Sequence, residues 1–147
     1  MKILRLLFLA FITLFTLENA FAQRRIDVGA EVWIEPGQTP EELDMWFSRM
    51  ADNKMRSARI FLMWNYIETA PATYDFSIAD TAFEAAKKHG IEIEASLFCT
   101  HAPTFYGEQY WYRTQRHTLL WSREIQEASA KFIEACVTRY RNHPALG

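Results

Sequence analysis

Three segments with the apolar pattern of β-strands alternate with three segments of helical periodicity, and no glycine-rich turn follows the first strand. The alternation predicts an α/β fold with a parallel sheet and right-handed crossovers. Without the glycine-rich turn, a (β/α)8 barrel is favoured over an open, doubly wound sheet. Because such a barrel needs about 250 residues, we expect the N-terminal portion of a TIM barrel, about three βα units, truncated before strand four.

The first unit combines a strand expected at residues 26–33 with a helix expected to begin at Pro40. Thr39 is suited to cap this helix, Pro40 occupies its first position, and Glu42 completes a capping box. The apolar residues that follow recur at helical spacing and predict the buried side of the helix. They are Leu43, Trp46, Phe47 and Met50.

The second unit begins with a strand expected at residues 55–64, which is almost continuously apolar after Arg59. This pattern is typical of a strand that is covered on both faces. A loop is expected at residues 65–74. A helix should then begin near Asp75 or Ser77 and end before Gly90, a residue type common directly after helices. Its expected inner face comprises Ala79, Ala82, Phe83 and Ala86.

The third unit consists of a strand expected at residues 91–98, a long aromatic loop at 99–121, and a helix that Ser122 is placed to cap. Residues 145–147 are expected to begin a fourth strand. The stripe of packed residues on the helix is expected to contain Ile125, Ser129, Phe132, Ile133, Cys136, Val137 and Tyr140.

The N-terminus has the pattern of a secretory signal peptide at residues 1–22. Lys2 and Arg5 precede an apolar run over residues 6–17, and alanines occupy positions 20 and 22. The run is shorter than the roughly 20 apolar residues of a membrane span. We therefore expect cleavage before Gln23, a catalytic-barrel segment at residues 23–147, secreted or periplasmic localisation, and no stable membrane anchor.

The composition is that of a globular protein, with 50% hydrophobic and 23% charged residues and a net charge of −2. Such a charge gives no indication of a nucleic-acid partner. The two cysteines, Cys99 and Cys136, lack the spacing of metal ligands, and we expect two separate thiols; export leaves a disulfide open as the alternative. The composition does not indicate an oligomeric state.

Arg59 is the most informative residue, because its permanent charge lies within an apolar strand and requires an anionic partner. Alternation places Ser57, Arg59, Phe61 and Met63 on one face, and Ala58, Ile60 and Leu62 on the other. One interpretation is an arginine that positions a catalytic carboxylate. The other is a structural ion pair, for example with Glu94 on the next strand. The polar alternation of Glu92 and Glu94 has no explanation in a strand buried on both faces.

The carboxyl ends of the predicted strands carry polar and aromatic side chains, which would share one rim in a barrel. Such a mixture suits sugars, whose hydroxyls need hydrogen bonds and whose apolar faces pack on rings. Ordinary surface or loop-packing roles are the alternative for each residue. The candidates for substrate binding or site positioning are Arg59, Glu35, Trp33, Trp64 and His101.

Several short motifs along the chain resemble those of one enzyme family. They are residues 29–35, the arginine strand at 58–64, Glu68, residues 74–76 and Asp80, and Arg139, Tyr140, His143 and Pro144. At these residues the chain resembles the N-terminal barrel of glycoside hydrolase family 42, the β-galactosidases. The sequence departs from the family pattern after Glu68, where Thr69 stands in place of a proline, and over residues 99–103, where a Thr-Pro-Thr stretch is replaced.

The resemblance implies a retaining glycoside hydrolase that cleaves terminal β-galactosides and needs neither a metal nor an organic cofactor. Both catalytic glutamates are then expected beyond Gly147, so this stretch alone would be inactive, and Arg59 would lie beside the nucleophile. Two alternatives stay open: a related barrel hydrolase acting on β-mannosides or β-glucosides, and a non-catalytic, secreted sugar-binding module.

Overall fold

The computed structural model describes residues 28–106 and 122–147. The signal peptide expected at residues 1–22, the start of the first strand and most of the aromatic loop lie outside these residues. Three strands, β1 (Gly29–Val32), β2 (Ser57–Met63) and β5 (Glu92–Phe98), form a parallel sheet in the order β1-β2-β5. The main helices are α2 (Pro40–Asp52), α4 (Ser77–His89) and α6 (Arg123–Tyr140). The predicted alternation of strand and helix is confirmed.

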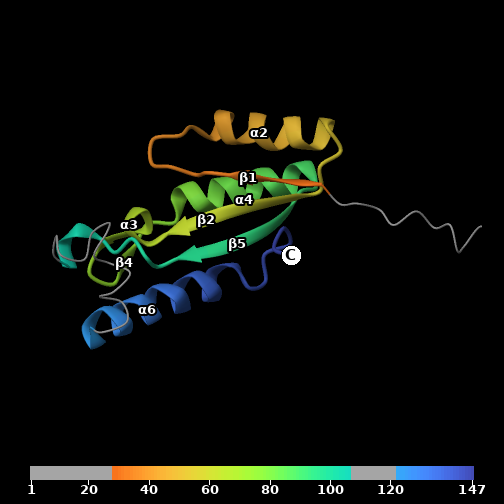
Figure 1. Cartoon of the computed structure of the whole chain (residues 1–147). Coiled ribbons are helices and arrows are strands. Elements are labelled where there is room, and N and C mark those ends of the chain that lie inside the picture. Colours follow the sequence, from red (N-terminus) through yellow and green to blue (C-terminus); the bar gives the residue numbers. More distant parts are fainter. Residues whose placement is uncertain (1–27, 107–121) are drawn as a thin grey trace, which may run out of the picture.

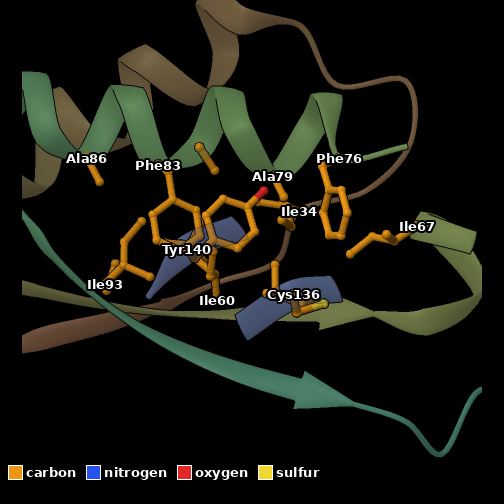
Figure 2. Close-up of a cluster of buried hydrophobic side chains, with 14 of the residues drawn as sticks. Ile34, Ile60, Ile67, Phe76, Ala79, Phe83, Ala86, Ile93, Cys136 and Tyr140 are labelled. Carbon is orange, nitrogen blue, oxygen red and sulfur yellow. The ribbon is translucent and has the colours of Figure 1, made fainter. Parts of the chain in front are cut away.

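The helices pack on one face of the sheet, and this face holds the core. Figure 2 shows Phe83 of α4 and Tyr140 of α6 close to Ile60 and Ile93 of the sheet. The rings of Phe83 and Tyr140 stack, with centroids 4.1 Å apart and an interplanar angle of 6°. In β2, alternation placed Ala58, Ile60 and Leu62 on the face opposite Arg59, and all three are buried.

The end of the described chain lies beside β5, in the position expected for a fourth strand. Ile93 N–H donates to the Ala145 carbonyl at 2.6 Å, and Gly147 N–H donates to the Ile93 carbonyl at 3.0 Å. Leu146 and Ile93 form a parallel bridge. The expectation that residues 145–147 continue the sheet is therefore confirmed, and the order along the sheet follows the order along the chain.

Helix α2 begins with the predicted capping box. The Glu42 N–H donates to Thr39 Oγ1 at 3.2 Å, and the Thr39 N–H donates back to Glu42 Oε2 at 2.8 Å. These two bonds satisfy amide groups that the first turn of a helix leaves without partners. Leu43 and Phe47 are fully buried beneath the helix, as predicted.

Helix α4 ends at Gly90, which has a left-handed backbone conformation with φ 67°. A side chain would be strained there, which explains the glycine. The Ile91 N–H then donates to the Ala86 carbonyl at 2.9 Å and turns the chain into β5. The four predicted inner residues of α4 are all buried.

Helix α6 is capped as predicted, since the Ile125 N–H donates to Ser122 Oγ at 3.4 Å. Its buried stripe is narrower than expected. Ile133 and Val137 are 37% and 48% exposed, respectively, so their assignment to the packed stripe was wrong. Each lies one position after a buried residue, Phe132 or Cys136, and is therefore rotated about 100° away from the core-facing line.

The segment at residues 65–74, expected as a loop, contains regular structure. It begins with the short helix α3 (Trp64–Ile67) and continues into an antiparallel hairpin of β3 (Glu68–Ala70) and β4 (Thr73–Tyr74). The hairpin turn includes Ala72, whose φ is 58°. These elements and the 3-10 helix η1 (Thr104–Tyr106) lie at the carboxyl ends of β2 and β5 (Figure 1).

Two further features of the described chain concern its cysteines and its helices. Cys99, which is half-buried, and Cys136, which is buried, are free thiols. Burial raises the pKa of both thiols, for Cys136 to about 12. Among the described helices none is both long and apolar enough to cross a membrane.

Candidate functional site

The face of the sheet opposite the helices is polar and largely uncovered, and it carries the candidate site. Glu31, Arg59 and Glu94 lie side by side on it, because the parallel register aligns Glu31 with Arg59 and Arg59 with Glu94. All three are exposed, as is Glu92. The alternation of Glu92 and Glu94 therefore follows from a strand that is covered on one face only.

Arg59 lies at the centre of this face and is held in two ways. Its Nε donates to Ser96 Oγ of β5 at 3.0 Å. Its guanidinium lies over the Phe61 ring, 5.7 Å from the centroid, a distance typical of a cation–π contact. Within the described residues no carboxylate forms an ion pair with Arg59, so the predicted structural pair with Glu94 is not present. The cation is oriented by neutral groups and faces the open side of the sheet.

A row of four rings crosses the carboxyl ends of the three strands. Trp33 and Phe61 have centroids 4.7 Å apart at an angle of 30°. Phe61 and Phe98 meet edge to face at 5.7 Å, and His101 stacks on Phe98 at 5.0 Å and 25°. Met63, which was expected on the same face, is buried at the end of β2. We call Trp33, Phe61, Phe98 and His101 the aromatic row.

Trp33 presents the most accessible ring surface of this row. It is 47% exposed. Phe61 packs against the Trp33 ring, and the Trp33 Nε1 donates to Glu31 Oε1 at 2.9 Å. The indole is thus held in one orientation while much of its surface stays open, which is the arrangement expected of a platform for the apolar face of a sugar.

The remaining rim candidates, Glu35 and His101, lie at either end of the row. Glu35 is exposed in the turn after β1, and Gln38 braces this turn. The Gln38 side chain accepts from the Glu35 N–H at 2.8 Å and donates to the Trp33 carbonyl at 3.3 Å. On the other side, His101 Nδ1 lies 3.3 Å from Thr100 Oγ1. Glu35 and His101 could both supply hydrogen bonds to hydroxyl groups.

Trp64 does not belong to the open face. It is fully buried, and its ring packs against Tyr106 at 5.5 Å and against Phe132 at 6.0 Å. Its Nε1 donates to Glu68, which is itself 2% exposed. Of the two roles expected for Trp64, only the positioning role is compatible with this burial.

The Arg59 face contains residues that the sequence pattern did not single out. Phe98 and Ser96 were expected only as part of the strand at residues 91–98, although both lie on this face. The available signal was that Glu92, Glu94, Ser96 and Phe98 occupy every second position, which places all four side chains on one face of a strand. It could be used only with the knowledge that one face of the sheet is uncovered.

The helix-covered side of the protein has a groove, but most of its charged side chains already form ion pairs. A groove between α2 and α4 is lined by Asp44, Asp80, Glu84 and Lys88. Three of its carboxylates are already engaged: Asp44 pairs with Lys88, Glu84 pairs with Lys87, and Asp80 accepts from Arg139 Nε at 2.7 Å. Over residues 28–106 and 122–147, no group of three or more His, Cys, Asp or Glu side chains is placed to hold a metal ion.

Comparison with known proteins yields a structural likeness. No protein-family model and no curated protein matches the sequence. The fold is similar to that of a β-galactosidase from the psychrophilic Marinomonas ef1, with a TM-score of 0.67 and 17% identity over 82% of this chain. The chain covers 20% of the length of that enzyme chain. At this identity the likeness shows a shared, partial α/β fold with a parallel sheet.

Proposed function

We propose that this chain forms the N-terminal part of the catalytic barrel of a secreted, retaining glycoside hydrolase of the β-galactosidase type. The observation that carries the proposal is the aromatic row beside Arg59, at the carboxyl ends of a sheet whose fold is similar to part of a β-galactosidase. Aromatic rings together with oriented polar groups are typical of sites that bind sugars.

The winding of the sheet supports the barrel. The parallel strands follow chain order, and residue Leu146 takes the next position after β5. All three long helices pack on the same face. A doubly wound sheet reverses its direction of growth and places helices on both faces, whereas a barrel keeps one direction and one face. In the proposed barrel the open face with Arg59 becomes the interior.

The proposed chemistry uses two carboxylates that the family resemblance assigns to strands beyond Gly147. In a retaining glycosidase these groups lie about 5 to 5.5 Å apart, one as acid/base and one as nucleophile. Arg59 would hold the nucleophile ionised and oriented through charge-assisted hydrogen bonds. Trp33, Glu35 and His101 would contact the substrate. No metal or organic cofactor is part of this proposal.

The proposed activity is tested with the protein expressed from the complete open reading frame. Its product should hydrolyse an aryl β-galactoside with retention of configuration, which is measured by following the anomer first released. The matched aryl β-mannoside and β-glucoside identify the related hydrolases, and higher turnover of either would replace the galactosidase assignment. No turnover of any of the three would refute the proposal.

A non-catalytic sugar-binding module is the second candidate, because Trp33 is 47% exposed and immobilised in this chain. The stability of residues 23–147 distinguishes the two. As part of a barrel, this stretch exposes half of an interior and unpaired strand edges, which promote aggregation, so we expect insoluble or molten protein. A soluble monomer with a sharp, cooperative melt would favour the module.

Secretion is proposed from the N-terminal pattern. Export should remove residues 1–22 and leave Gln23 at the new N-terminus, because Ala20 and Ala22 suit signal peptidase. N-terminal sequencing of exported protein measures this. Recovery of a membrane-embedded protein that retains Met1 would contradict it.

A further inference from the structure

A buried carboxylate joins three segments at the carboxyl end of the sheet. Glu68 is 2% exposed at the start of β3. Its Oε1 accepts from the Tyr106 hydroxyl at 2.8 Å and from the Ala72 N–H at 2.7 Å, and its Oε2 accepts from Trp64 Nε1. The donors come from η1, the hairpin turn and α3, respectively. We call this group the Glu68 latch.

Burial of the Glu68 carboxylate costs free energy that burial of an apolar side chain at this position would not. An isolated carboxylate in an apolar environment is strongly unfavourable unless its oxygens are hydrogen-bonded. Within residues 28–106 and 122–147, no cation pairs with Glu68, and three neutral donors provide its stabilisation. An apolar side chain would fill the same volume at lower cost, so the carboxylate is explained by what it ties together.

The segment from residue 99 to residue 106 is the part that the latch holds. This segment leaves β5 at one end, where His101 stacks on Phe98. Its other end is η1, where the Tyr106 hydroxyl donates to Glu68. Between them Ala102 is buried, and the Tyr106 N–H donates to the Pro103 carbonyl at 3.1 Å. His101 thus lies between two anchors, one of which is the latch.

We propose that Glu68 is a positioning residue that, through Tyr106, fixes the segment carrying His101 at the end of the aromatic row. The part concerning sugar binding rests on the function proposed above; the mechanical part does not. Burial and the hydrogen bond to Glu68 both raise the pKa of Tyr106, so its hydroxyl stays protonated and donates at every physiological pH.

Tyr106→Phe is the cleanest test, because it removes one hydroxyl and leaves Glu68 its other two donors. Tyr74→Phe is the matched control: Tyr74 is half-buried nearby, and its hydroxyl makes no hydrogen bond to any described residue. Hydrogen exchange in the full chain supplies the measurement. In Tyr106→Phe, we expect the Tyr106 amide, which donates to the Pro103 carbonyl, to exchange about tenfold faster or more, with β5 unchanged. Equal exchange in Tyr106→Phe, Tyr74→Phe and wild type would overturn the latch.

Glu68→Gln supplies a second, independent perturbation. All three partners present hydrogens to the carboxylate, and an amide has only one accepting oxygen. In either orientation the glutamine NH2 faces the backbone N–H of Ala72 or the Nε1–H of Trp64. The variant should therefore accelerate exchange of the Ala72 amide or of the Trp64 indole N–H, both of which Tyr106→Phe leaves bonded to Glu68. Wild-type exchange of both protons in Glu68→Gln would overturn the central role of Glu68.

Kinetics of the full-length enzyme on an aryl β-galactoside separate positioning from general stability. Tyr106→Phe should raise KM severalfold while kcat per folded molecule changes little, because His101 is displaced but the catalytic carboxylates are not. Faster exchange with an unchanged KM would overturn the link to the sugar site. Faster exchange in a protein that hydrolyses no glycoside would support the mechanical latch and refute the proposed enzyme, so the two failures are distinguishable.

Discussion

Trp33 and Phe61 pack ring against ring across neighbouring strands, 4.7 Å between centroids and 30° between planes. Phe61 in turn lies beneath the guanidinium of Arg59. One phenylalanine therefore links the exposed indole directly after β1 to the charged residue in the middle of the open face. Substitutions of Trp33 and Arg59 should consequently affect different steps at one site.

In the proposed full-length glycoside hydrolase, replacement of Trp33 by alanine should weaken substrate binding. Loss of a stacking surface predicts a KM about tenfold higher, which corresponds to about 1.4 kcal/mol, with a smaller change in kcat. Steady-state kinetics with an aryl β-galactoside provide the measurement. Met45→Ala is the control, because Met45 is similarly exposed, at 41%, but lies on α2. Equal KM values for Trp33→Ala and wild type would exclude Trp33 from the sugar site.

Replacement of Arg59 by alanine should act mainly on kcat. If Arg59 orients the nucleophile, its loss should lower kcat by about two orders of magnitude, the scale of one preorganised electrostatic contact. Arg59→Lys should recover little, because lysine lacks the planar fork that binds a carboxylate. Turnover per folded molecule and melting temperature must be measured together.

The control for Arg59 is Arg123→Ala, which removes an exposed arginine that pairs with Glu127 on the surface of α6. This variant should retain full activity. A folded Arg59→Ala protein with normal kcat would assign Arg59 a structural role in the sheet, through Ser96 and Phe61.

Removal of the capping hydroxyl should destabilise the protein modestly without changing its site. Thr39→Ala removes the acceptor for the Glu42 N–H, and loss of an N-cap side chain costs about 1 kcal/mol. For a domain of this size we expect a fall of about 4 °C in melting temperature, measured by circular dichroism. Thr39→Ser keeps an accepting hydroxyl and should melt within about a degree of wild type. Identical melting of Thr39→Ala and wild type would contradict the capping box.

The thiol of Cys136 should be unreactive in the folded protein. Burial raises its pKa to about 12, and a raised thiol pKa means less thiolate at any given pH. At pH 8 the thiolate fraction falls about a thousandfold below that of an ordinary cysteine, whose pKa is about 8.5. Alkylation followed by mass spectrometry should therefore label Cys136 only after unfolding. Rapid labelling in native protein would contradict its burial, and no labelling after unfolding would reveal a disulfide with Cys99.

The order of elements could be predicted from the sequence because it depends on local patterns. The capping box at Thr39 and Glu42, the glycine at position 90 and the apolar spacing of α4 each act within a few residues. They therefore appear in the sequence as directly as in the structure. The alternation of Arg59 with apolar neighbours similarly identified the two faces of β2.

The tertiary structure decided which surfaces meet and which stay open. The sequence could not reveal that the Arg59 face is uncovered, that Phe98 and Ser96 flank it, or that Trp64 turns inward to bind Glu68. Residues 65–74 formed a helix and a hairpin because Glu68 reaches Ala72 and, from a distant segment, Tyr106. Local propensity specifies the elements, but contacts between segments far apart in the chain depend on register and packing, which no local pattern encodes.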